Sequence, residues 1–149
     1  MAPDYTPRGS RARCVFCAVV AGAAPAHEVL RTDRVVGFLD RNPLFHGHVL
    51  LVPVVHVQTH DEIPADLATD WLAASQALQR AVEQATGADG ALLIVNNVVS
   101  QSVPHVHQHV IPRHRDDGLS RWLGPRRRYR DDAHAAATAA AVRAALTLR

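Results

Sequence analysis

The stretch that decides both the fold and the chemistry of this chain is Gln101-Ser102-Val103-Pro104-His105-Val106-His107-Gln108-His109-Val110-Ile111-Pro112-Arg113. Its β-branched residues and its bounding prolines predict a strand from His105 to Pro112. Because alternate side chains of a strand point to one face, His105, His107 and His109 are expected to form a row, with the residues between them turned away. Three imidazoles in line supply a nucleophile, an acid and a base, so a catalytic site is the first expectation.

Three uses of such a row stay open on these residues alone. The first is nucleophilic catalysis by one of the imidazoles. The second is a catalytic metal site, because two histidines separated by one residue on a strand can both reach one zinc ion. The third is that the histidines are surface residues or hydrogen-bonded core residues without chemistry, the more common fate of a lone histidine.

The rest of the chain supplies a sheet and a helix that can support such a strand. Short runs rich in β-branched residues predict four further strands, Glu28 to Arg31, Val35 to Asp40, His48 to Pro53 and Ala91 to Asn97. Apolar residues spaced by three and four predict a helix from about Pro64 to Thr86, with Gly87 as its stop. Short links favour antiparallel pairing of the first three strands, so the predicted fold class is α+β.

A second helix is predicted at the alanine-rich end of the chain, over Ala133 to Arg149. Asp131 or Asp132 is placed to cap its start, and alanine is the best helix former. The arginines at 126, 127, 128 and 130 precede it. Such a run is usually a solvated surface, and contact with nucleic acid or phosphate is the less expected role.

Length and composition limit the class of protein. The 149 residues suffice for one domain with a core, and 48% of them are hydrophobic. We found no apolar run near the roughly 18 residues of a membrane span, and Met1 to Ser10 lacks the features of a secretory signal. We therefore expect a soluble, cytoplasmic protein with a flexible tail over residues 1–10, one domain over 11–125 and a basic, helical extension over 126–149.

Further motifs, in a fixed order along the chain, indicate how the triad is used. The segment Cys14-Val15-Phe16-Cys17 is followed by Gly22, Pro25, Val36-Gly37-Phe38-Leu39-Asp40, Pro43, Gly47-His48-Val49-Leu50, Pro53 and His56, and then by Gln101-Ser102-Val103 and the triad. In this order the chain resembles the histidine-triad (HIT) family over about Cys14 to Arg113, and within it a zinc-containing bacterial branch. The resemblance implies a five-stranded antiparallel sheet with one long helix, a short N-terminal helix and a C-terminal helical tail.

By this resemblance, His107 is the nucleophile that attacks the α-phosphorus of an adenosine or other purine nucleotide and forms a covalent nucleotidyl-histidine. His109, Gln101 and Ser102 are the implied partners of the phosphate, the leaving group and water. The substrates of such relatives are phosphoramidates, aminoacyl adenylates or dinucleoside polyphosphates. The rival hypotheses are a metal-dependent hydrolase that uses the histidine row as ligands and a nucleotide-binding protein without turnover.

The same resemblance assigns the remaining site residues. Among the implied nucleotide-binding residues, Asp40 is the acid that accepts hydrogen bonds from the ribose hydroxyls. The others form an apolar slot for the base or are polar groups near it, and they are Phe38, Phe16, Val15, Val19, Asn96, Asn97 and His48. Two thiols need two more ligands, and the branch supplies them, so Cys14, Cys17, His56 and His105 are expected to hold a structural zinc ion that takes no part in the chemistry. The expected partners are a small nucleotide and a second copy of the chain, since relatives commonly pair so that their two sheets become continuous. The helix carrying Trp71 is one candidate contact surface. We expect neither a membrane nor a nucleic acid as a partner.

Three features depart from the family pattern, one of them His46 in place of a common proline before Gly47-His48. Gln108 stands where the family has an apolar residue. The loop Val98-Val99-Ser100 is short and lacks the glycine that relatives often carry near the phosphate.

Overall fold

The computed structural model describes residues 13–119 and 127–147 of the chain. The chain forms two compact units, Met1–Arg115 and Asp116–Arg149. The tail expected over residues 1–10 and the first arginine of the basic run, Arg126, lie outside the described residues. No described helix is long and apolar enough to cross a membrane.

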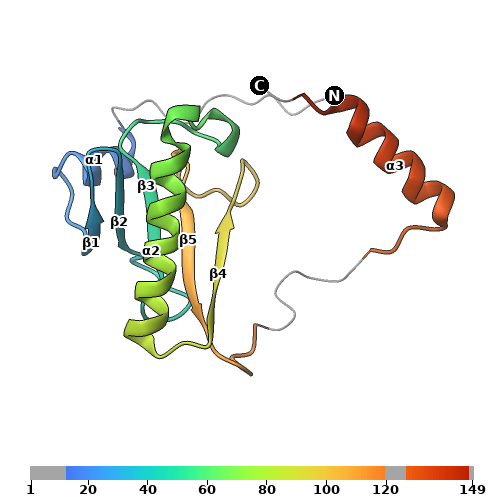
Figure 1. Cartoon of the computed structure of the whole chain (residues 1–149). Helices are drawn as coiled ribbons and strands as arrows, with labels where there is room; N and C mark the ends of the chain where they lie inside the picture. Colours follow the sequence, from blue (N-terminus) through green and yellow to red (C-terminus); the bar gives the residue numbers. More distant parts are fainter. Residues whose placement is uncertain (1–12, 120–126, 148–149) are drawn as a thin grey trace. The chain divides into compact units, whose positions relative to one another are not determined.

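The first unit is built on a five-stranded antiparallel sheet with the strand order β1-β2-β3-β5-β4 (Figure 1). Its strands are β1 (Glu28–Arg31), β2 (Val35–Leu39), β3 (Val49–Pro53), β4 (Gly90–Val95) and β5 (Gln108–Arg113). This confirms the five predicted strands and the α+β class. The triad strand β5 lies between β3 and β4, so side chains just before and within β5 are flanked by neighbours on both sides.

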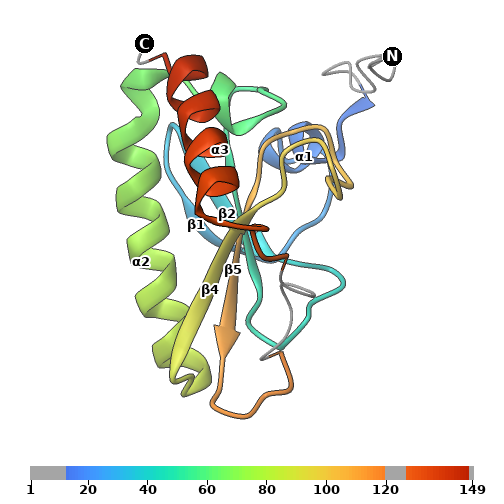
Figure 2. The same cartoon turned by 90° about the vertical axis from the view of Figure 1, so that its right-hand side faces the viewer.

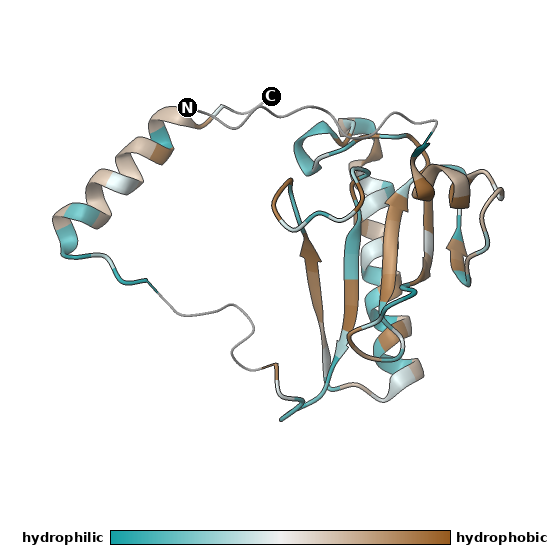
Figure 3. Cartoon of the chain, turned by 180° about the vertical axis from the view of Figure 1, so that it is seen from behind, coloured by the Kyte–Doolittle hydropathy of each residue, from teal (hydrophilic) through white to brown (hydrophobic). Residues whose placement is uncertain are grey.

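One face of the sheet is covered by α2 (Ala68–Thr86). Its buried side chains pack on β2, β3 and β5 in one cluster made of Val35, Val49, Leu51, Leu67, Trp71, Ala74, Leu78, Val82 and Val110. Figure 3 shows the strands largely in the hydrophobic colour, while α2 carries both colours, as an amphipathic helix does. Gly37 permits the close approach, because a Cβ there would lie 3.1 Å from Leu78 Cδ1. The helix ends where predicted, at Gly87 in the left-handed conformation (φ 65°).

The opposite face carries the short helix α1 (Val15–Val20), as Figure 2 shows. A second cluster fills this side: Cys14, Phe16, Val19, Val36, Phe38, Leu50 and Val52. Neighbouring residues of β2 and β3 thus serve opposite clusters, which is the strict alternation of a sheet buried on both faces. The triad histidines lie on this α1 side of the sheet, where Phe16 contacts His105 and His107.

The N-terminal ends of two elements lie three or more residues from the predicted boundaries. The helix begins at Ala68, because His60–Glu62 and Ala65–Leu67 form two 3-10 turns, η2 and η3, ahead of it. The last strand begins at Gln108 rather than His105. The register pairs Leu51 with Gln108, so continuing the ladder would bring Val106 opposite Pro53. Pro53 has no N–H to donate, its carbonyl bonds to the His105 ring, and the N–H of Val106 bonds to Val57 O instead.

The second unit contains α3 (Asp132–Ala145). The carboxylate of Asp131 accepts a hydrogen bond from the His134 N–H at 2.7 Å, as predicted for a helix cap. The Tyr129 ring stacks edge-on against His134 with centroids 5.3 Å apart. No residue of α3 is buried.

Candidate functional site

The three triad imidazoles do line up, although only His109 belongs to a strand. The ring centroids of His107 and His109 are 5.0 Å apart, and Phe16 lies edge-on to both His105 and His107. His105 and His107 are almost fully buried, with 0% and 2% of their surface exposed. The histidines thus gather as predicted, but the first two lie ahead of β5, with His105 in a bend.

The hydrogen bonds of His107 fix which of its nitrogens carries the proton. Nδ1 lies 2.8 Å from the carbonyl oxygen of His105. A carbonyl oxygen only accepts, so Nδ1 carries the hydrogen, and Nε2 of a neutral ring keeps its lone pair. Burial lowers the pKa of His107 below 6.5, against the opposing effects of this hydrogen bond and of the Asp40 charge. The ring is consequently neutral at physiological pH, with a free nucleophilic nitrogen.

His109 is oriented by a chain of contacts that begins at the main chain. The N–H of Leu44 donates to His48 Nδ1 at 3.2 Å, so the proton of the His48 ring is on Nε2. That nitrogen lies 2.9 Å from His109 Nδ1, which must then accept. The proton of His109 is left on Nε2. Burial, and to a smaller extent the interactions with His107 and His48, lowers the pKa of His109 to about 4. This ring is therefore also neutral.

Asp40 follows β2 and faces the same histidines. One carboxylate oxygen accepts the Asn42 N–H at 2.8 Å, and the other lies 3.6 Å from His48 Nε2. Burial lowers the pKa of His48, while the Asp40 charge acts in the opposite sense. The charge of Asp40 therefore acts on His48, His107 and His109, on the α1 face of the sheet.

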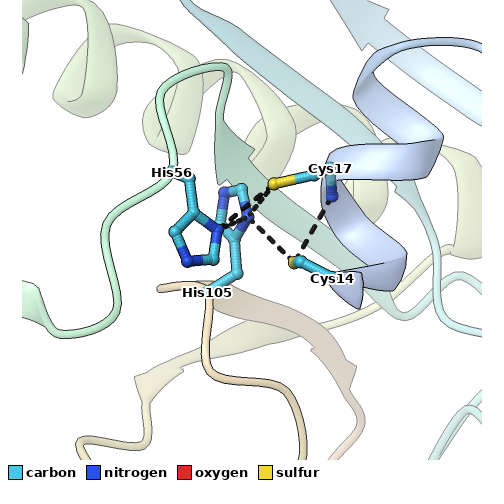
Figure 4. A group of neighbouring side chains, drawn as sticks. All are labelled: Cys14, Cys17, His56 and His105. Carbon is cyan, nitrogen blue, oxygen red and sulfur yellow. Dashed lines mark hydrogen bonds between the residues drawn. The ribbon is translucent and has the colours of Figure 1, made fainter. Parts of the chain in front are cut away.

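A second group joins the two cysteines to two histidines (Figure 4). Cys17 Sγ lies 3.2 Å from His56 Nδ1, and His105 Nδ1 lies 3.5 Å from Cys14 Sγ, 3.6 Å from Cys17 Sγ and 3.3 Å from His56 Nδ1. His105 donates from Nε2 to the Pro53 carbonyl at 2.9 Å, which leaves its Nδ1 lone pair aimed into the group. Burial lowers the pKa of His105 to about 4. Four donor atoms from α1, the loop after β3 and the triad segment therefore converge on one point.

The other constellation able to hold a metal among the described residues is Asp40, His48 and His109. Its hydrogen bonds argue against that use. His48 Nε2 carries the ring proton because Nδ1 is occupied by the Leu44 N–H, so Nε2 has no lone pair for a cation. Neither constellation includes His107. The geometry favours a hydrogen-bonded relay here and gives no support to a metal held by the whole triad.

The polar residues upstream of the triad are mostly engaged with the main chain. The amide of Gln101 donates to Gln58 O at 2.6 Å and accepts from the Val98 N–H at 3.0 Å. Asn97 accepts from the His60 N–H at 2.8 Å, whereas Asn96 immediately follows β4. Ser102 is exposed. Gln101 thus braces the loop before the triad.

The residues expected to form the base slot divide into two kinds. Phe16, Val19 and Phe38 are buried in the α1-side cluster, and the rings of Phe16 and Phe38 meet at 5.5 Å. Val15 is 50% exposed and lies outside that cluster. The groups that sequence reasoning missed are the amide of Leu44 and the carbonyls of Pro53 and Gln58, and main-chain atoms leave no signal in a sequence.

Comparison with known proteins identifies this arrangement. The model of the family described as "HIT domain" matches residues 21–116. This chain belongs to the HIT domain family. The match spans the sheet, α2 and the whole triad.

Named relatives of this HIT protein include hydrolases of nucleotides. It is 36% identical over 108 residues to an adenylylsulfatase, HINT3, of Arabidopsis thaliana, an alignment that covers 71% of this chain and 55% of the plant protein. It is 31% identical over 121 residues to the adenosine 5'-monophosphoramidase HNT1 of Candida albicans, covering 77% of this chain and 79% of the fungal one. This chain thus spans only about half the length of its plant relative.

A solved structure bears on the cysteine-histidine group. A zinc-bound histidine triad family protein of Mycobacterium smegmatis superposes with a TM-score of 0.69 at 31% identity, over 92% of this chain and 100% of that one. The fold of the HIT domain is thereby matched, and a zinc ion is present in a protein of this architecture.

Proposed function

We propose that the chain is a nucleotide hydrolase or transferase that attacks the α-phosphorus of adenosine or other purine nucleotide conjugates through His107. The observation that carries this proposal is the hydrogen bond of 2.8 Å from His107 Nδ1 to the His105 carbonyl, because it leaves Nε2 as a free nucleophile. Relatives named as an adenylylsulfatase and a phosphoramidase act on nucleotides with a leaving group at the α-phosphorus, which supports the same class of reaction.

In the first step, His107 Nε2 forms a bond to the α-phosphorus and the bond to the leaving group breaks. The imidazole, which keeps its Nδ1 proton, becomes cationic. The His105 carbonyl and the negative charge of Asp40 stabilise that cation, since both interactions favour the charged form of the His107 ring. His109 Nε2–H donates a hydrogen bond to a phosphate oxygen.

In the second step, water attacks the phosphorus, and the bond to His107 Nε2 breaks with its electron pair returning to the ring, which becomes neutral again. The nucleoside monophosphate leaves, and the proton lost by the water passes to solvent. Asp40 accepts hydrogen bonds from the ribose hydroxyls. The base lies in a slot lined by Phe16, Val19, Phe38 and the more exposed Val15. Asn96 is the better candidate for the phosphate than Asn97, because the Asn97 side chain is already bonded to the His60 amide. Ser102 is free to rotate toward water, whereas Gln101 acts by holding the loop.

Trapping of the intermediate tests the proposal. The protein is mixed with adenosine 5'-phosphoramidate, quenched within the first turnover in alkali, which preserves phosphorus–nitrogen bonds, and digested for mass spectrometry. We expect one adenylyl group on His107, no adduct in His107→Asn, and an adduct that accumulates in His109→Asn. Turnover by the wild type without any adduct favours the metal-dependent alternative, and binding of AMP without turnover of any substrate favours a non-catalytic nucleotide-binding protein.

We propose that Cys14, Cys17, His56 and His105 hold one zinc ion. With Zn–S bonds of about 2.3 Å and Zn–N bonds of about 2.05 Å, a tetrahedral site has N–S edges of about 3.5 Å and an N–N edge of about 3.3 Å. Three of the four N–S distances here are 3.2, 3.5 and 3.6 Å, the N–N distance is 3.3 Å, and all four donor atoms lie within 4.8 Å of one another, which suits such an ion. Elemental analysis should find about one zinc per chain. A metal-free preparation that melts at the same temperature as the zinc-loaded one contradicts the assignment.

We further propose that two copies of the chain pair. The strand β4 lies at an edge of the sheet, and Leu72 of α2 is 57% exposed. Trp71 itself does not offer a contact, because it is only 9% exposed and packs in its own core. Light scattering of the wild type and of Leu72→Glu tests this point, with a shift to monomer expected for the variant.

A further inference from the structure

The cysteine-histidine group and the nucleophile are joined through one residue. The ring of His105 belongs to the group, while the main-chain carbonyl of the same residue accepts the Nδ1–H of His107. The position of that carbonyl therefore depends on where the His105 ring is held. The ring is held by the Pro53 carbonyl at Nε2 and, at Nδ1, by the two thiols and His56 Nδ1.

A second connection runs through the residue between the cysteines. Phe16 is 8% exposed, and its ring meets the His107 ring edge-on at a centroid distance of 5.1 Å and an interplanar angle of 80°. It belongs to α1, a helix of only six residues, and a helix so short does not hold its own shape in water. The two cysteines that flank Phe16 in the sequence tie this helix to His56, in the loop after β3, and to His105, ahead of β5.

We propose that the cysteine-histidine centre positions the nucleophile, with Phe16 and His105 as its two positioning residues, rather than serving only to attach the N-terminal segment. The inference rests on the proposed role of His107. With a metal holding the four donor atoms together, the His107 ring would be held at Nδ1 by the carbonyl of one ligand residue, His105, and contacted by Phe16 from the helix that the cysteines would fix. Loss of the centre releases both supports at once.

The ribose-binding side of the site has its own supports. Asp40 is oriented by the Asn42 amide and His48 by the Leu44 amide, and neither contact involves α1 or the cysteines. Disturbing the centre is therefore expected to slow the formation of the covalent intermediate even at saturating substrate, where weaker binding of the base against α1 no longer limits the rate. A residue with a merely structural role changes stability and leaves the rate at saturating substrate unchanged.

The first test keeps the metal and removes the contact. Phe16→Leu retains an apolar side chain in the cluster but loses the aromatic ring that contacts His107, and Val20→Ala is the matched control, in the same helix and packed against the same cluster. For Phe16→Leu we expect the single-turnover rate of adenylylation at saturating substrate to fall about 10- to 100-fold, since small misplacements of a reacting group have effects of this size. Saturation keeps any weaker binding of the base, against which Phe16 also lies, out of the measured rate. The zinc content should stay within about twofold of wild type, and Val20→Ala should keep the wild-type rate.

The second test removes the metal. Cys17→Ser is compared with wild type for zinc content, AMP affinity, and the imidazole nitrogen resonances of His107 in NMR spectra. We expect loss of zinc, broadened or shifted His107 resonances and a slowed adenylylation rate at saturating substrate, with any loss of AMP affinity confined to the base contacts of α1. Trp71 fluorescence reports folding on the far side of the sheet, and if Cys17→Ser does not fold, Phe16→Leu decides alone.

The outcomes separate this inference from the proposed function. If the wild type forms no adduct on His107, the proposed function fails. If the wild type forms the adduct, and both Phe16→Leu and zinc-free Cys17→Ser form it at the wild-type rate, the positioning role is overturned and the proposed function stands.

Discussion

The two faces of the sheet are built from the same strands but differ in what they bury. Under α2, alternate residues of β2, β3 and β5 meet Trp71 and Leu78 in an apolar cluster. Under α1, the intervening residues share their space with the imidazoles of His48, His105 and His107, all at most 3% exposed. One face is stabilised by the burial of apolar surface, whereas the other buries polar rings that need a partner for each nitrogen.

This difference teaches where stability and chemistry reside. Burial lowers the pKa values of the imidazoles and keeps them neutral, which suits a nucleophile but makes the α1 face depend on hydrogen bonds to main-chain groups. The apolar face supplies the rigid support on which those bonds rest. Substitutions on the two faces should therefore separate stability from activity.

Truncation on the apolar face has the largest expected effect on stability. Leu78 is 5% exposed in the α2 cluster and lies against Gly37 of β2. Leu78→Ala should lower the free energy of unfolding by about 2–5 kcal/mol, through lost burial and the cavity that remains. Urea denaturation followed by Trp71 fluorescence measures the loss, and AMP affinity of the folded protein should not change. A large drop in affinity contradicts the separation of the two faces.

The opposite result, weaker AMP binding with little change in stability, is expected from a substitution of Asp40 on the α1 face. Asp40→Asn keeps the oxygen that accepts the Asn42 amide but removes the charge, so the hydrogen bonds to a ribose weaken. We expect AMP to bind about 10- to 100-fold more weakly, because hydrogen bonds to charged groups contribute about 1.5–3 kcal/mol. Stability should stay within about 0.5 kcal/mol of wild type. Titration calorimetry measures the affinity, and Asp33→Asn, in the exposed turn between β1 and β2, is the control and should bind AMP as the wild type does.

The apolar face was the more predictable of the two from sequence. The spacing of Leu67, Trp71 and Leu78 fixes which side of the helix is buried, and Gly87 marks its end, since both signals are local. The five strands follow from runs of β-branched residues in the same way. The cluster of Cys14, Cys17, His56 and His105 was also placed together correctly, because a family resemblance carries long-range information that spacing lacks.

The α1 face was predicted less completely because its geometry depends on main-chain groups. The strand stops short of His107 because Pro53 cannot donate to it, a fact that depends on the register of β3 against β5. The tautomers of His48 and His105 are set by the Leu44 amide and the Pro53 carbonyl. Any residue type supplies these groups, so no residue pattern could reveal them.

Backbone strain in the loop before the triad predicts a smaller change in stability, and in this case the substitution stabilises the protein. Val98 adopts φ 67°, a left-handed conformation that disfavours a β-branched residue, and the Gln101 side chain braces it. Val98→Gly should raise the free energy of unfolding by up to about 1 kcal/mol, the strain relieved less the entropy cost of glycine. Val99→Gly is the matched control, because Val99 is 78% exposed and has no such conformation, and it should not stabilise the protein. A destabilised Val98→Gly contradicts this account.

The pH dependence of stability gives the smallest expected effect, because His109 is only partly buried. Its pKa falls from 6.5 to about 4 in the folded protein. Between these values the unfolded chain binds more protons than the folded one, so the contribution of neutral His109 is present above about pH 6.5 and is lost as the pH falls through about 4. His109→Asn offers an oxygen to His48 in place of Nδ1 and does not titrate. Denaturation at pH 7.5, 6 and 5 should show a shallower decline for the variant. Loss of a bound metal in acid affects both proteins alike, so the difference between the two curves belongs to His109, and superimposable curves mean that its burial does not influence stability.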